Sequence, residues 1–169
     1  MKIFRNSILL VVAVLMLQGC KVSYSFTGAD IGNASTFQVN NFINNAAIVE
    51  PKAARQLTLA LQDIILNQTS LSIVNNNADL IYEGEITQYY VAPITATSQS
   101  TAAENRLTIA VNVRFFNTQE PDKDFEQRFS FYKDFGGSSQ LVGTQLDDAL
   151  DEIFERITQD IFNQSLANW

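Results

Sequence analysis

RLTIAVNVRFF, at residues 106–116, alternates apolar and polar side chains over almost its whole length. Side chains of a β-strand point to opposite faces in turn, so this period of two indicates a strand with one buried face. The apolar set is Leu107, Ile109, Val111, Val113 and Phe115, and the opposite set contains Arg106, Thr108, Asn112 and Arg114. We therefore expect an antiparallel sheet with one face in the core and the other partly open.

Two segments extend this sheet. Residues 125–132 return after a turn at residues 117–123, which contains Pro121-Asp122. A regular hairpin places Arg114 opposite Glu126 and Arg106 opposite Asp134, and exposed ion pairs of this kind contribute only a few tenths of a kcal/mol.

Residues 80–91 form the second segment, which is rich in Ile and Tyr. Simple alternation puts Tyr82, Ile86 and Tyr90 on one face. It puts Glu83, Glu85 and Thr87 on the other. Tyr89, Phe116 and Tyr132 are expected on the same face as the arginines.

Helical spacing appears twice, at residues 51–67 and 145–166. Their apolar stripes include Leu57, Leu61 and Ile65 in the first, and Leu150, Ile153 and Ile157 in the second. Short strands are expected at residues 36–42 and 71–74. The fold class is therefore α+β: a single mostly antiparallel or mixed β-sheet with two amphipathic helices packed on one face, in the order β-α-β-β-β-β-α.

The N-terminus resembles a bacterial lipoprotein signal. Lys2 and Arg5 precede ten apolar residues, 8–17, too short a run for a membrane-spanning helix, and Gly19-Cys20 follows. Resemblance to lipoproteins implies acylation of Cys20, which would anchor the chain in a membrane. Lys21 after the cysteine implies the outer membrane. We expect a signal peptide at 1–19, an acylated tether at 20–35 and one domain at 36–169.

The composition excludes several classes of function. The chain has 169 residues, no histidine, one cysteine and a net charge of −7. Histidine relays and multi-thiolate metal sites are therefore excluded, and we expect no cofactor, no metal and no catalytic residue. The acidic balance argues against a nucleic-acid partner. Removal of residues 1–19 takes away Lys2 and Arg5 but no acidic residue, so the net charge falls further.

Two sets of side chains on the open sheet face could have a function. Arg106, Arg114 and Arg128 could present guanidinium groups to the phosphates of a glycolipid or to a partner protein, or they could form cross-strand ion pairs. Glu83 and Glu85 lie ~6.8 Å apart on one strand face, a spacing compatible with a carboxylate hydrolase. We favour a solvated polar face instead, because adjacent acidic residues are common on the polar side of a half-exposed strand.

Several short segments resemble the LptE family of lipopolysaccharide-assembly lipoproteins. They are GCKVSYSF at 19–26, GEIT at 84–87, NRLTI at 105–109, DFEQ at 124–127 and ANW at 167–169. The resemblance implies an outer-membrane lipoprotein that is the partner and plug of the LptD β-barrel. It also implies help with barrel assembly and with insertion of lipopolysaccharide into the outer leaflet, without covalent chemistry. The domain would face the periplasm and the barrel lumen. A stand-alone glycolipid-binding lipoprotein is the alternative, but the acidic charge favours the barrel partner.

Overall fold

The computed structural model describes residues 28–94, 104–136 and 141–167, and it confirms the predicted α+β class. One mixed sheet and two helices follow the predicted order, with a two-residue strand, β2, added before the first helix. The strands are β1 (Thr36–Val39), β2 (Ile43–Asn44), β3 (Ser72–Ile73), β4 (Leu80–Ile94), β5 (Glu104–Asn117) and β6 (Phe125–Gly136). The helices are α2 (Ala53–Gln68), α3 (Thr144–Leu166) and the short 3-10 turn η1 (Pro121–Lys123).

The strand order in the sheet is β3-β1-β4-β5-β6, and β2 pairs with the same side of β4 as β1 does. The long strands β4, β5 and β6 are antiparallel, whereas β1 pairs in parallel with β3 and β4. The β5–β6 hairpin has the predicted register, with Arg114 opposite Glu126 and Arg106 opposite Asp134. This agreement follows from a regular turn closed by η1.

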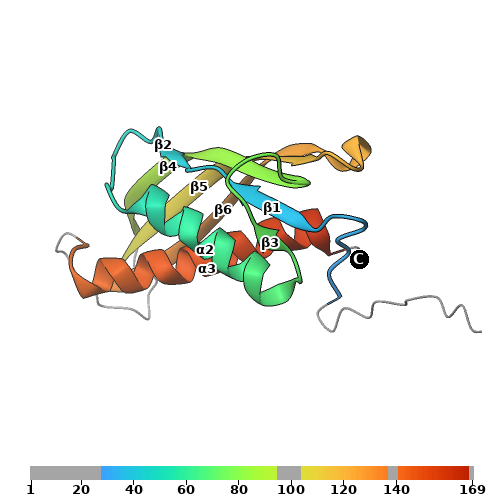
Figure 1. Cartoon of the computed structure of the whole chain (residues 1–169). Coiled ribbons are helices and arrows are strands. Elements are labelled where there is room, and N and C mark those ends of the chain that lie inside the picture. The colour runs from blue at the N-terminus through green and yellow to red at the C-terminus, as the bar shows by residue number, and fades with distance from the viewer. Residues whose placement is uncertain (1–27, 95–103, 137–140, 168–169) are drawn as a thin grey trace, which may run out of the picture.

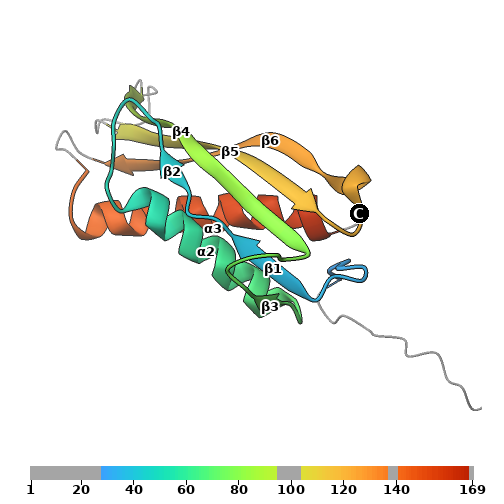
Figure 2. The ribbon, with the colours of Figure 1, turned by 45° about the horizontal axis from the view of Figure 1, so that its top comes forward.

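Both long helices cover the same face of the sheet (Figures 1 and 2). The core between the two layers contains large side chains from both helices and from strands β1, β4 and β5. Fully buried examples are Phe37, Leu57, Tyr82, Phe115, Ile153 and Phe154. No helix in the described ranges is long and apolar enough to span a membrane. The outer face of the sheet, opposite the helices, remains without a covering layer of described chain.

The prediction for the second half of β4 was wrong. A β-bulge lies between Ile86 and Gln88, so that Ile86 faces Val111 but Gln88 faces Ala110. One extra residue reverses the facing of all that follow, as bulges do. Tyr89 is therefore buried in the core, and Tyr90 is exposed on the outer face.

Gly84 lies where β4 closely approaches the chain on both sides. A Cβ atom added there would lie 2.1 Å from the backbone oxygen of Asn112 and 2.9 Å from Cε1 of Phe42. No side chain fits at that distance, so glycine is required where β4 passes both neighbours.

Candidate functional site

The outer face of the sheet carries all three candidate arginines, in rows set by strand register. Each row contains one side chain from β4, one from β5 and one from β6. The rows are Ala92–Arg106–Asp134, Tyr90–Thr108–Tyr132, Glu85–Asn112–Arg128 and Glu83–Arg114–Glu126. The face is therefore a mixed surface of ionic, amide and aromatic groups.

Arg106 forms the predicted cross-strand ion pair. Its Nε and Nη2 atoms lie 2.7 and 2.8 Å from the two carboxylate oxygens of Asp134, a bidentate arrangement. The guanidinium also covers the ring of Tyr132, 3.7 Å from its centroid. Hydrogen bonding from Arg106 lowers the pKa of Asp134, so the pair is held charged.

Arg114 has different ion-pair partners from the one predicted. Its Nε donates to Glu83 at 3.0 Å, and its Nη1 lies 3.6 Å from Glu85, both on β4. Glu126 is opposite Arg114 in register but instead accepts a hydrogen bond from Asn112 at 2.6 Å. Two carboxylates on one side attract the guanidinium more than a single carboxylate on the other.

The same contacts bear on the hydrolase hypothesis. Glu83 accepts hydrogen bonds from Arg114 and from Asn40, and these bonds lower its pKa. The acid of a glycosidase needs the opposite, a raised pKa. Glu83 and Glu85 thus serve as ion-pair partners of Arg114 on this face.

Arg128 is the candidate arginine without an acidic partner in the described chain. Its Nη2 atom donates to the amide oxygen of Gln88 at 2.6 Å. An amide orients the guanidinium but leaves its charge uncompensated. Of the three arginines, Arg128 is therefore the one best able to bind an external anion.

The sequence interpretation missed Asn40, Gln88 and Asn112, which complete this polar network. Asn112 could have been found from its place in the outward set of β5. Gln88 could not, because only the bulge brings it to the outer face.

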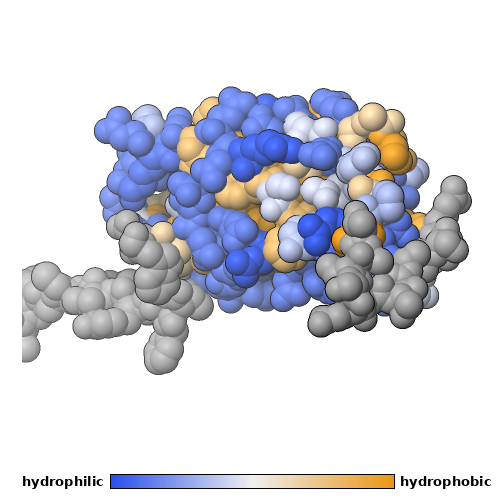
Figure 3. Space-filling model, turned by 180° about the vertical axis from the view of Figure 1, so that it is seen from behind, coloured by the Kyte–Doolittle hydropathy of each residue, from blue (hydrophilic) through white to orange (hydrophobic). Residues whose placement is uncertain are grey.

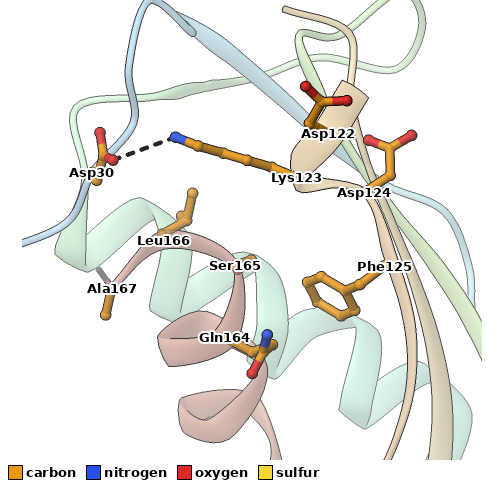
Figure 4. Close-up of a pocket in the computed structure, with 9 residues that line it drawn as sticks. All are labelled: Asp30, Asp122, Lys123, Asp124, Phe125, Gln164, Ser165, Leu166 and Ala167. Carbon is orange, nitrogen blue, oxygen red and sulfur yellow. Dashed lines mark hydrogen bonds and ion pairs between the residues drawn. The ribbon is translucent and has the colours of Figure 1, made fainter. Parts of the chain in front are cut away.

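One groove lies beside α2 rather than on the outer face of the sheet. It measures about 600 Å³ and is lined by Asn41, Phe42, Pro51, Ala54, Arg55, Thr58, Leu59 and Gln62. A smaller cleft of about 330 Å³ lies between η1, the start of β6 and the last turn of α3 (Figure 4). Lys123 reaches across its mouth toward Asp30, with Nζ 3.4 Å from the carboxylate.

The smaller cleft marks where the chain enters the domain. The backbone N–H of Asp30 donates to the carbonyl oxygen of Leu166 at 2.6 Å, and Ala29 forms a bridge with Ala167. Residues 29 and 30 of the expected tether are thus held against the end of α3. Cys20, the expected lipidation site, lies outside the described residues.

Seen from behind the view of Figure 1, the surface is mostly hydrophilic, with hydrophobic residues near its middle (Figure 3). Side chains of Phe125 and Phe131 on the edge strand β6 are only partly buried.

The space between the sheet and the helices is filled by described side chains. A glycolipid carrier would need an enclosed apolar cavity in that place. In the described ranges, no group of three or more acidic or sulfur side chains is placed to hold a metal.

Solved structures share this fold at low sequence identity. The protein CT253 from Chlamydia trachomatis has a TM-score of 0.53 and 9% identity, covering 80% of this chain and 99% of its own. The protein XCC0632 from Xanthomonas campestris also has a TM-score of 0.53 and 9% identity, covering 82% and 86%. At such identity the likeness concerns the fold alone. No curated protein sequence matches the chain.

A family model decides the relationship. The model for LptE, described as lipopolysaccharide-assembly, matches residues 34–165, from just before β1 to the last turn of α3. The chain belongs to the LptE family. The predicted membership of this family is thereby confirmed, and the match covers the segments at 84–87, 105–109 and 124–127. The open sheet face is therefore a surface of a protein of the lipopolysaccharide-assembly family.

Proposed function

We propose that this LptE-family chain is a lipid-anchored outer-membrane protein that binds an LptD-like β-barrel. As its partner and plug, it would help the barrel to assemble and lipopolysaccharide to enter the outer leaflet. The observation that carries the proposal is the LptE family match over residues 34–165.

The electrostatics of the outer sheet face support a protein partner over phosphate binding by all three arginines. Arg106 and Arg114 are paired with carboxylates, and only Arg128 keeps its charge uncompensated. The outer face also exposes Tyr90 and Tyr132. Aromatic side chains and arginine are enriched in protein interfaces, where their large surfaces carry much of the binding energy.

The lipid anchor supports the location. Residues 20–27 separate Cys20 from the described domain, and a chain of that length spans at most about 28 Å. The domain end formed by η1 and the last turn of α3 would therefore stay close to the membrane. Two or three acyl chains on Cys20 would hold it there stably.

Affinity purification from detergent-solubilised outer membranes tests this proposal. We expect the full-length chain to recover a large β-barrel protein in a stoichiometric amount. Depletion of the chain should lower both the amount of barrel and the lipopolysaccharide on the cell surface. A Cys20→Ala variant, which cannot be acylated, serves as the control for the anchor. Reproducible absence of a barrel in the wild-type purification would refute the proposal.

A further inference from the structure

Arg55 on α2 is unusual among the cations of this acidic protein. The described lysines and arginines are paired with carboxylates, except for Arg55 and Arg128, and Arg128 donates to an amide. The Arg55 side chain is exposed and makes no ion pair or hydrogen bond with any described residue. The chain has a net charge of −7, so carboxylates are available to pair with most cations. An arginine without such a partner therefore sets this part of the surface apart.

Arg55 lies at the groove of about 600 Å³ beside α2, whose volume falls within the usual range for binding sites. Phe42, Pro51, Ala54 and Leu59 give this groove its apolar surface, and Asn41 and Gln62 add amide groups. The hydroxyl of Thr58 does not offer a free acceptor, because it already accepts from the backbone N–H of Phe42 at 3.1 Å. The groove thus combines apolar surface with one available positive charge.

The groove continues into an exposed stripe along the helix. Arg55, Leu59, Gln62 and Leu66 follow each other at intervals of four, three and four residues, which places them on one side of α2. The side chains of Leu59 and Leu66 are 47% and 43% exposed, although an amphipathic helix usually turns such residues to the core. The two leucines lie about 10.5 Å apart along the helix axis.

We infer that this side of α2, the Arg55 stripe, is a docking surface for a segment of a protein partner that carries a carboxylate next to apolar side chains. The inference rests on the proposed function, in which that partner is the barrel. Charge complementarity selects the carboxylate, since Arg55 is the free charge at the groove. Leu59 and Leu66 are separated by the polar Gln62, which suits discrete side chains better than a continuous acyl chain. A phosphate-rich amphiphile would also meet repulsion from the acidic protein.

Two surface variants test the inference in the full-length acylated chain. Arg55→Glu reverses the free charge, and Leu59→Ser combined with Leu66→Ser removes the apolar stripe. Arg156→Glu is the matched control, because it makes the same charge change on the exposed face of α3. Circular dichroism and thermal unfolding should show that all variants fold, since every substituted side chain is exposed or partly exposed.

We expect Arg55→Glu and the double leucine variant to recover about tenfold less barrel than the wild type and the Arg156→Glu control. Equal recovery by all of them overturns the inference and leaves the proposed function standing. Failure of the wild type to recover a barrel overturns both. A photo-reactive benzoylphenylalanine at position 66 identifies the occupant. An adduct with the barrel supports the inference, whereas an adduct with lipid or with a second copy of the chain refutes it.

Discussion

Gly84 gives the most direct prediction at the scale of a single residue. Gly84→Ala places a methyl group 2.1 Å from a backbone oxygen of β5, and backbone cannot move aside as a flexible side chain can. Overpacking of this kind costs about 1–3 kcal/mol. Urea unfolding should show that loss for Gly84→Ala. Gly136→Ala is the control, because a Cβ there meets nothing within 4 Å, and an equal loss in both variants would contradict the explanation.

The arginines show which ion pairs could be predicted from the sequence and which could not. Arg106 and Asp134 could be paired in advance because a regular hairpin fixes which residues are opposite. The partner of Arg114 could not, because its choice between β4 and β6 depends on strand order, and periodicity does not determine strand order. The acylation of Cys20 remains a prediction from the sequence.

At the scale of elements, one hydroxyl joins α2 to the strand connection beside it. Oγ1 of Thr58 accepts from the backbone N–H of Phe42 and donates to the carbonyl of Ala54 at 2.9 Å. Thr58→Val keeps the shape but leaves the buried N–H of Phe42 unpaired, which costs about 1–3 kcal/mol. Thr58→Ser retains the bonds and should lose less, as measured by chemical denaturation. If Thr58→Val were as stable as the wild type, the hydroxyl would have no such role.

Asp79 joins three elements at the start of β4. One carboxylate oxygen accepts from the backbone N–H groups and hydroxyls of Ser35 and Thr36, and the other accepts from Gln119. These bonds lower the pKa of Asp79 well below its usual value. The backbone N–H of Ser35 has the largest effect, followed by the side chains of Thr36 and Gln119 and the backbone N–H of Thr36. A lowered folded-state pKa means that the carboxylate stabilises the fold above the unfolded pKa of about 3.9. This contribution is lost as pH falls from there toward the folded-state pKa.

The expected result is a stability difference between wild type and Asp79→Asn that is full near neutral pH and shrinks below about pH 4. Urea unfolding at a series of pH values measures it. Asp63→Asn, on the exposed surface of α2, should show little difference at any pH. A pH-independent deficit of Asp79→Asn would show that the charge is not what stabilises this junction.

The two helices and the strands β5 and β6 could be predicted because each has one apolar side with a clear period. The β4 bulge could not, because one extra residue leaves no mark in a segment whose tyrosines suit either face. The parallel pairing of β1 with β3 and β4 was equally hidden. Strands of two to four residues carry too few side chains to specify their neighbours.

At the scale of the whole molecule, most cations are used internally, and this limits where an anionic glycolipid could bind. Arg106→Glu combined with Arg114→Glu would place new carboxylates beside Asp134, Glu83 and Glu85. That double variant should therefore lose stability as well as binding, which makes it a poor probe of binding alone. Arg128, held by an amide, is the better probe.

Arg128→Glu should weaken binding to lipopolysaccharide-containing vesicles by about tenfold, the value of one charge-assisted contact. The thermal unfolding midpoint should hardly change, since the substitution breaks only an exposed bond to Gln88. The effect should diminish as salt is raised, because exposed charges are screened over about 10 Å at 0.1 M. Vesicle co-sedimentation at two salt concentrations measures the binding and its dependence on salt. Arg156→Glu is the control with the same change of charge. Equal binding by wild type and Arg128→Glu would mean that this face contacts protein rather than glycolipid, because no other arginine in the described part of this face keeps a free charge.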